Sequence, residues 1–118
     1  MTQRSVPQPL CGLRVIEFTH MVMGPTCGML LADMGAEVIK VEPLGGEGTR
    51  RLLGAGAGFF PMFNRNKKSI EVDLRKSEGA ALARELAHGA DVVIENFKPG
   101  TLAGAHTFAN AQPTRRPG

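Results

Sequence analysis

The sequence predicts an α/β fold in which an open, mostly parallel sheet carries helices on its faces. Two short runs of β-branched and apolar residues, 14–18 and 37–41, indicate buried strands, and the segment between them has the apolar spacing of a helix. A second pair of strand-like runs, 69–74 and 91–94, encloses another helical segment. This order is typical of parallel sheets, because the crossover between two parallel strands is usually a helix.

The first unit is a strand, a helix and a second strand. After the strand at 14–18 comes a polar turn, and Gly24-Pro25 predicts a helix start because proline is harmless in the first helical turn. An apolar stripe should turn one face of this helix to the core, and Gly35 should end it in a left-handed cap. The stripe consists of Cys27, Leu30, Leu31 and Met34. The strand at 37–41 completes a right-handed βαβ unit.

The second unit begins with a glycine-rich stretch. Residues 43–58 predict a mobile loop with at most one turn near Thr49, and three phenylalanines should fix its end against the core. These are Phe59, Phe60 and Phe63. The strand at 69–74 alternates with period two, and Ser77 or a neighbour should cap a helix that Gly89 closes. That helix should turn Leu82 and Leu86 to one face, and 91–94 forms the next strand.

The composition is that of a globular domain. The 118 residues fit one domain, and the hydrophobic (42%) and charged (21%) fractions exclude a fibrous or disordered protein. No apolar run approaches the ~20 residues of a membrane-spanning helix, and the start lacks the apolar core of a secretory signal. We therefore expect a cytoplasmic protein with no membrane partner.

The charge and the cysteines restrict the possible ligands. A net charge of +3 suits nucleic acid or a phosphorylated small molecule. The basic residues form small separate clusters rather than one stripe with a reading motif, so we expect no nucleic-acid partner. Cys11 and Cys27 lack the paired spacing of a zinc or redox site, which predicts no metal centre. We expect both thiols to be reduced, structural and buried.

Residues 103–118 break the pattern. They have no periodicity and end in Pro, Arg and Gly, which predicts a disordered tail. A frameshift or a truncated gene model is our preferred explanation for this abrupt change.

Polar segments at the strand exits indicate a ligand site. In doubly wound sheets, ligands collect beyond the carboxyl ends of the strands. Several segments there occur in the order and spacing of one enzyme family. They are Phe18-Thr19-His20 ahead of Gly24-Pro25, Gly35-Ala36-Glu37-Val38-Ile39-Lys40-Val41-Glu42, Met62-Phe63-Asn64-Arg65-Asn66-Lys67-Lys68-Ser69, and Asp91-Val92-Val93-Ile94-Glu95-Asn96-Phe97-Lys98-Pro99-Gly100. Over residues 9–102 the chain resembles the front end of the class III coenzyme A transferases of the CaiB/BaiF type, which include formyl-CoA transferase.

The resemblance implies a Rossmann-like domain that binds a coenzyme A thioester as substrate. The cofactor-binding residues it implies are Val22, Met23, Val72, Arg75, Asn96, Phe97 and Lys98. Arg75 is expected to contact a phosphate or the ribose, Asn96 to hydrogen-bond, and Phe97 to shape the pantetheine path. From the residues alone, Arg75 could be a solvated charge, Asn96 a turn former and Phe97 a core residue. Lys67 and Lys68 could face solvent or fix their loop through salt bridges.

The resemblance also implies the reaction. An aspartate attacks the acyl-CoA thioester and gives a mixed anhydride, and CoA then passes to an incoming carboxylic acid. That aspartate lies beyond the region covered, so we assign no catalytic residue and expect the chain alone to be inactive. We expect His20 to be structural. For the full-length protein the resemblance implies an interlocked homodimer.

Some positions depart from the family pattern. Val22 stands where formyl-CoA transferases often have Gln, Pro43 where a basic residue is common, and Gly104 where Arg is expected. These departures leave the acyl donor and acceptor open. One alternative is a fragment of an α-methylacyl-CoA racemase. Another is a non-catalytic module that binds a phosphorylated ligand or nucleic acid.

Overall fold

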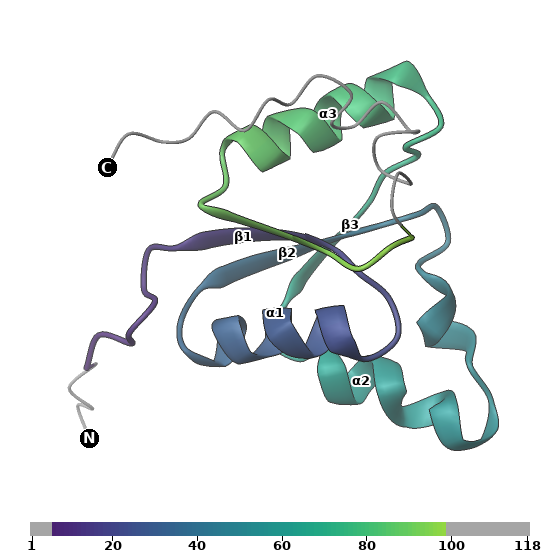
Figure 1. Cartoon of the computed structure of the whole chain (residues 1–118), viewed down its shortest axis with the longest axis horizontal. Coiled ribbons are helices and arrows are strands. Elements are labelled where there is room, and N and C mark those ends of the chain that lie inside the picture. Colours follow the sequence, from purple (N-terminus) through teal and green to yellow (C-terminus); the bar gives the residue numbers. More distant parts are fainter. Residues whose placement is uncertain (1–5, 99–118) are drawn as a thin grey trace.

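The computed structural model describes residues 6–98, which form an α/β domain (Figure 1). The strands are β1 (Arg14–Phe18), β2 (Glu37–Glu42), β3 (Lys68–Glu71) and β4 (Val92–Glu95). The α-helices are α1 (Met23–Asp33), α2 (Phe59–Phe63) and α3 (Ser77–His88), and two 3₁₀ turns, η1 (Gly48–Arg51) and η2 (Gly54–Gly58), lie between β2 and α2. The tail predicted at 103–118 lies outside the described residues.

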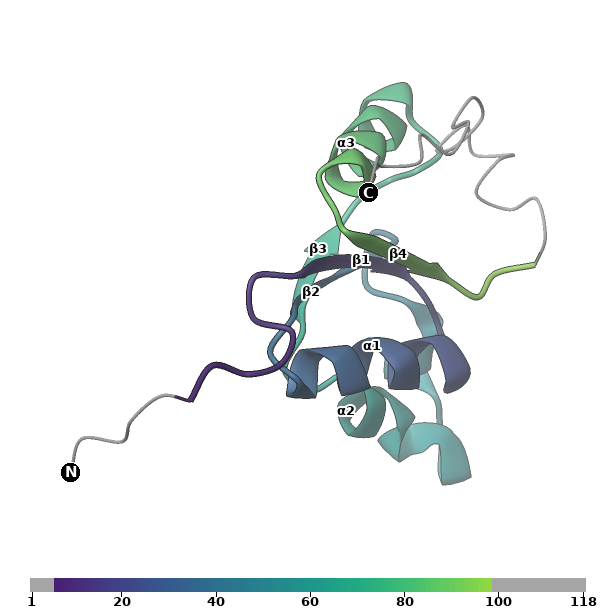
Figure 2. The same ribbon diagram turned by 60° about the vertical axis from the view of Figure 1, so that its left-hand side comes forward.

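The four strands form one parallel sheet in the order β3-β2-β1-β4. Helices α1 and α2 lie on one face of the sheet and α3 on the other (Figures 1 and 2). This confirms the predicted fold class, including the parallel strand–helix–strand unit at its start. Because all four strands run the same way, their carboxyl ends meet at one edge of the sheet.

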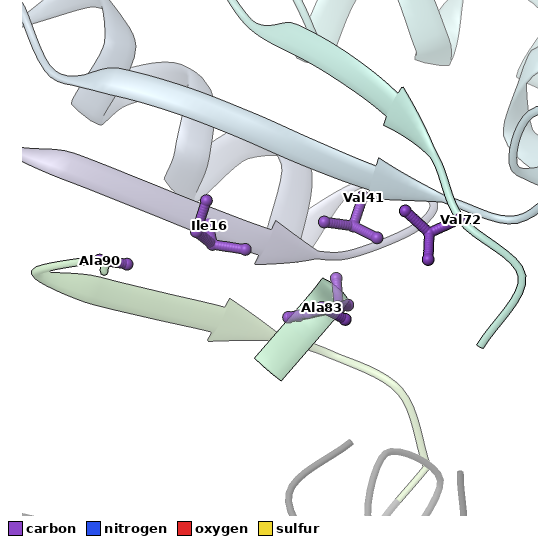
Figure 3. Close-up of a cluster of buried hydrophobic side chains, with 6 residues drawn as sticks. Ile16, Val41, Val72, Ala83 and Ala90 are labelled. Atoms are coloured by element: carbon purple, nitrogen blue, oxygen red, sulfur yellow. The ribbon is translucent and has the colours of Figure 1, made fainter. Parts of the chain in front are cut away.

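Alternating residues of the strands feed two apolar clusters, one on each face. On the α3 face, Ile16 and Val41 pack with Val72 and Ala83 (Figure 3). Phe18 belongs to the same cluster. On the α1 face, the cluster consists of Val15, Ala32, Ala36 and Val38. The α1 face is unusual because the same strands also place Glu17 and Lys40 in fully buried positions.

Helix α1 is rotated relative to the prediction. Three of the four residues of the expected core stripe are exposed, and Leu31 alone is half-buried. The buried face instead consists of Gly24, Pro25, Gly28, Met29 and Ala32. Glycine and alanine on this face allow the helix backbone to approach the sheet closely, which larger side chains would prevent. The helix also begins at Met23, two residues before the expected proline start, and Gly35 ends it in the predicted left-handed conformation (φ 104°).

Smaller differences concern the second half and the cysteines. Strand β3 ends at Glu71 rather than at 74. The N-cap of α3 is Lys76, the neighbour of Ser77, and its side chain makes no cap hydrogen bond. The buried residues of α3 are Ala80 and Ala83, whereas Leu82 is exposed. Cys11 and Cys27 are free but exposed, so the expectation that they are buried was wrong.

Within residues 6–98, no helix is long and apolar enough to cross a membrane.

Candidate functional site

A pocket of about 510 Å³ opens where the strands end at their carboxyl edge. Its apolar wall is made by Phe18, Val41, Val72 and Phe97. Its charged lining residues are Glu42, Arg51, Asp73 and Arg75. The pocket therefore combines an apolar surface with ionic groups, a lining suited to a ligand that has both an apolar and a charged part.

The structure gathers three of the seven predicted binding residues around this pocket. Val72, Arg75 and Phe97 line it. The other four are placed differently, at the start of α1 and after β4. Val22 is the N-cap of α1, Met23 is 82% exposed, Lys98 is exposed, and Asn96 faces the turn after β1. Their binding roles stay predictions.

Asn96 links the end of β4 to the turn after β1. Its side-chain Oδ1 accepts a hydrogen bond from the backbone N–H of His20 (3.0 Å), and its Nδ2 donates to the carbonyl of the same residue (2.9 Å). The imidazole of His20 stacks on Phe97, with 5.2 Å between ring centroids. The Nδ1 atom of His20 is buried without a partner among residues 6–98. This arrangement gives Asn96 a structural role and places Phe97 between the pocket and His20.

Arg75 is paired with a carboxylate of its own turn. Its Nε lies 3.1 Å from Asp73 Oδ1, and its side chain is 88% exposed. The hydrogen bond from Arg75 lowers the pKa of Asp73, and Asp73 in turn raises the pKa of Arg75. The two charges therefore largely cancel at the pocket wall.

A buried ion pair lies between the sheet and α1. Lys67 Nζ is 2.6 Å from Glu17 Oε1, and the two side chains are 2% and 0% exposed. The same ammonium donates to the carbonyl of Pro25 (2.9 Å) and to Asn64 Oδ1 (2.8 Å). Burial lowers the pKa of Lys67, and Glu17 opposes that effect. Lys67 thus fixes its loop against β1 and α1, whereas Lys68 is exposed and pairs with Glu37.

A second polar group holds the loop after β2 to the turn after β1. Lys40 Nζ donates to the carbonyl of Thr19 (3.0 Å) and lies 3.5 Å from Glu47 Oε1. The side chain of Glu47 accepts a hydrogen bond from the backbone N–H of Thr49 (2.8 Å). The hydroxyl of Thr49 in turn accepts a hydrogen bond from the backbone N–H of Met21 (2.8 Å). Met21 has a positive φ of 65°, a conformation that needs such support in a residue other than glycine. The loop is therefore positioned by buried hydrogen bonds.

A third polar group is centred on the buried carboxylate of Glu42. Glu42 accepts two hydrogen bonds of 2.7 Å from Arg50 and others from Ser69 and the backbone of Glu47. Burial alone would raise the pKa of Glu42, but these hydrogen bonds outweigh it and lower the pKa to about 2. The guanidinium of Arg50 also lies over the Phe60 ring, 3.8 Å from its centroid. These buried ionic contacts, which the sequence analysis did not predict, reach the pocket through Glu42, one of its lining residues.

The sequence of this chain matches a known protein family. Residues 10–117 match the model of CoA-transferase family III. The chain belongs to this family. It is 49% identical over 108 residues to a succinyl-CoA–D-citramalate CoA-transferase from Chloroflexus aurantiacus, covering 86% of this chain and 27% of that protein.

Two solved structures share the fold. The Rv3272 protein of Mycobacterium tuberculosis superposes with a TM-score of 0.78 at 46% identity, covering 85% of this chain and 28% of its own. A CAIB/BAIF family protein from Brucella suis superposes with a TM-score of 0.77 at 44% sequence identity. The match covers 85% of this chain and 29% of the Brucella protein. The present chain therefore spans about a quarter of the length of these relatives.

The close approach of α1 in this CoA-transferase family III chain makes Gly28 sensitive to substitution. A Cβ on Gly28 would lie 3.0 Å from the carboxyl carbon of Glu17 and closer still to one of its oxygens. We expect Gly28→Ala to destabilise the chain by about 1–3 kcal/mol, although alanine favours helices. Urea unfolding measures this. Gly58→Ala is the control, because nothing lies within 4 Å of its Cβ, and an equal change in both variants would contradict the prediction.

No metal site was found in residues 6–98. No group of three or more His, Cys, Asp or Glu side chains there is arranged to hold a metal ion.

Proposed function

We propose that this chain forms the coenzyme A-binding part of an acyl-CoA:carboxylate CoA-transferase, which transfers CoA between carboxylic acids through an aspartyl anhydride. The observation that carries the proposal is the pocket at the carboxyl edge of the sheet. It gathers Val72, Arg75 and Phe97, which the family resemblance implied as binding residues, around one cavity. Membership of CoA-transferase family III supports the substrate class.

The chemistry of coenzyme A matches the two kinds of surface in the pocket. Its pyrophosphate and 3′-phosphate need cationic donors, which the guanidinium groups supply, and a planar guanidinium fork suits phosphate oxygens. The pantetheine arm is less polar and fits against Phe97 and Val72, both in the apolar wall. In this arrangement the phosphates lie at the charged rim and the arm follows the apolar wall.

We propose that the attacking aspartate is supplied by a part of the protein beyond the described residues, so the chain alone does not turn over. The contacts of the described aspartates support this. Asp33 binds Arg65 and Asn66, Asp73 binds Arg75, and Asp91 accepts from the backbone of Arg14. Each carboxylate is already used by the scaffold. The cytoplasmic location and the interlocked homodimer stay predictions.

Replacing Arg75 tests whether the pocket binds coenzyme A. We expect Arg75→Ala to weaken CoA binding roughly tenfold, because it removes a cation and leaves the carboxylate of Asp73 unpaired on the pocket wall. Calorimetric titration of the chain with CoA measures this. Lys76→Ala is the matched control, because it removes the same charge one residue away and does not line this pocket.

The same titration separates the proposal from a nucleic-acid module. We expect saturable CoA binding and no binding of random duplex DNA at moderate salt. If the chain bound duplex DNA with a steep salt dependence and did not bind CoA, the proposal would be wrong. Equal losses in Arg75→Ala and Lys76→Ala would show that only net charge matters.

A further inference from the structure

Three arginines lie at or beside the pocket, and their charges are balanced differently. Arg50 is held by the carboxylate of Glu42, and Arg75 by that of Asp73. Arg51 instead donates from Nη1 to the carbonyl of Gly45 (2.9 Å) and from Nη2 to that of Gly46 (3.2 Å). Among the charged residues of the described part that line the pocket, Arg51 is the one that no carboxylate neutralises.

Backbone carbonyls hold Arg51 in place without cancelling its charge. Gly45 and Gly46 both have a φ of +85°, a left-handed conformation that favours glycine, and their carbonyls accept from the two terminal nitrogens of the guanidinium. A guanidinium has five N–H donors, so three remain for a ligand after these two bonds. Because the side chain is already oriented, less conformational entropy is lost when it binds an anion.

The position of Arg51 relative to the apolar wall indicates the kind of anion. Arg51 shares the pocket with Phe97 and Val72, so an anion bound to it would belong to a ligand whose remaining part is less polar. Glu42 and Asp73, the two acidic groups of the lining, are both occupied by other arginines. The uncompensated positive charge therefore favours a phosphorylated ligand at this rim.

We propose that Arg51 binds a phosphate group of coenzyme A and is the main cationic determinant of affinity in this pocket. This inference rests on the proposed function and adds to it a residue that the sequence analysis did not select. Arg51 differs from Arg75 in one testable respect. Replacing Arg51 leaves no carboxylate unpaired, so the loss of CoA affinity measures the contribution of the Arg51 cation alone.

The test is calorimetric titration of the chain and of Arg51→Gln with coenzyme A. We expect Arg51→Gln to weaken CoA binding about tenfold or more. Arg51→Lys should weaken it less, because lysine keeps the charge but lacks the planar guanidinium that the two carbonyls orient. Arg14→Gln is the matched control. It makes the same charge change at the opposite end of β1, outside the pocket, and should leave the affinity unchanged.

Two shortened ligands show which phosphate Arg51 contacts. If Arg51→Gln binds dephospho-CoA as tightly as the unaltered chain does, Arg51 contacts the 3′-phosphate. If Arg51→Gln also binds dephospho-CoA more weakly, Arg51 contacts the pyrophosphate. Either result supports the inference, provided that pantetheine, which has no phosphate, binds both proteins equally. Circular dichroism and urea unfolding of Arg51→Gln check that the fold is retained.

The failure of this inference differs from that of the proposed function. If the unaltered chain binds CoA and Arg51→Gln binds it equally well, Arg51 has no such role and the proposed function stands. If Arg51→Gln and Arg14→Gln lose affinity equally, the effect is one of net charge and the inference is wrong. If the unaltered chain does not bind CoA, both proposals are overturned.

Discussion

Replacing Lys67 with methionine should destabilise the folded chain by about 3–5 kcal/mol. The ammonium of Lys67 is 2.6 Å from Glu17 Oε1, and both side chains are almost completely buried. Methionine fills a similar volume but leaves the carboxylate of Glu17 without its counter-charge in a region of low dielectric. The carbonyl of Pro25 and the side-chain oxygen of Asn64 lose a donor as well. Urea unfolding monitored by circular dichroism measures the loss.

Two further variants distinguish a buried ion pair from a general loss of charge. Glu17→Gln combined with Lys67→Met should recover much of the stability, because neither charge is then left alone in the interior. Arg65→Gln breaks the exposed pair with Asp33 and should cost less than about 1 kcal/mol. A Lys67→Met cost as small as that of Arg65→Gln would mean that water screens Glu17 after all.

The fold was predictable because its strands and turns have strong local signals. The apolar runs around Ile16 and Val38 are short, rich in β-branched residues and bounded by polar turns, which is typical of strands in a parallel sheet. Gly35 ends α1 where a left-handed residue was expected. These features depend on neighbouring residues alone, so the sequence contains them.

The facing of α1 was not predictable from apolar spacing. The periodicity of Leu30 and Met34 indicates an apolar stripe but cannot tell which side faces the sheet. The face that carries Gly28 and Ala32 packs on the sheet, because small residues permit a short distance between helix and sheet. A glycine within a helix is the signal that could have indicated this approach.

The candidate site was predictable in part. Val72 and Phe97 reach one pocket because each follows a parallel strand, and strand exits meet at one edge. The buried ionic network was missed, although Glu17 and Lys40 interrupt apolar strands and lie opposite each other in the register of β1 and β2. A charge inside a buried strand indicates a hidden partner, but identifying Lys67 and Glu47 as those partners required the tertiary structure.

Acid should unfold the chain partly through the protonation of Glu42. Folding lowers the pKa of this carboxyl from 4.5 to about 2. Between these values the unfolded chain binds more protons than the folded chain, so stability falls as the pH falls. The carboxylate therefore contributes roughly 3 kcal/mol that is fully present above pH 4.5 and is lost as the pH approaches 2. Urea unfolding at a series of pH values measures this decline.

Glu42→Gln isolates this carboxyl from the other acidic groups. The amide keeps one oxygen for Arg50 but has no charge and cannot be protonated in this range, so we expect the variant to be less stable by about 3 kcal/mol at pH 7. The difference between the two proteins should shrink below pH 4.5 and nearly vanish at and below pH 2, where the natural side chain becomes protonated in the folded protein too. Asp33 and Glu37 also have lowered pKa values, but they are not buried and are present in both proteins, so their titration cancels in the difference. A difference that stayed constant from pH 7 to pH 2 would mean that Glu42 stabilises the fold by packing rather than by its charge.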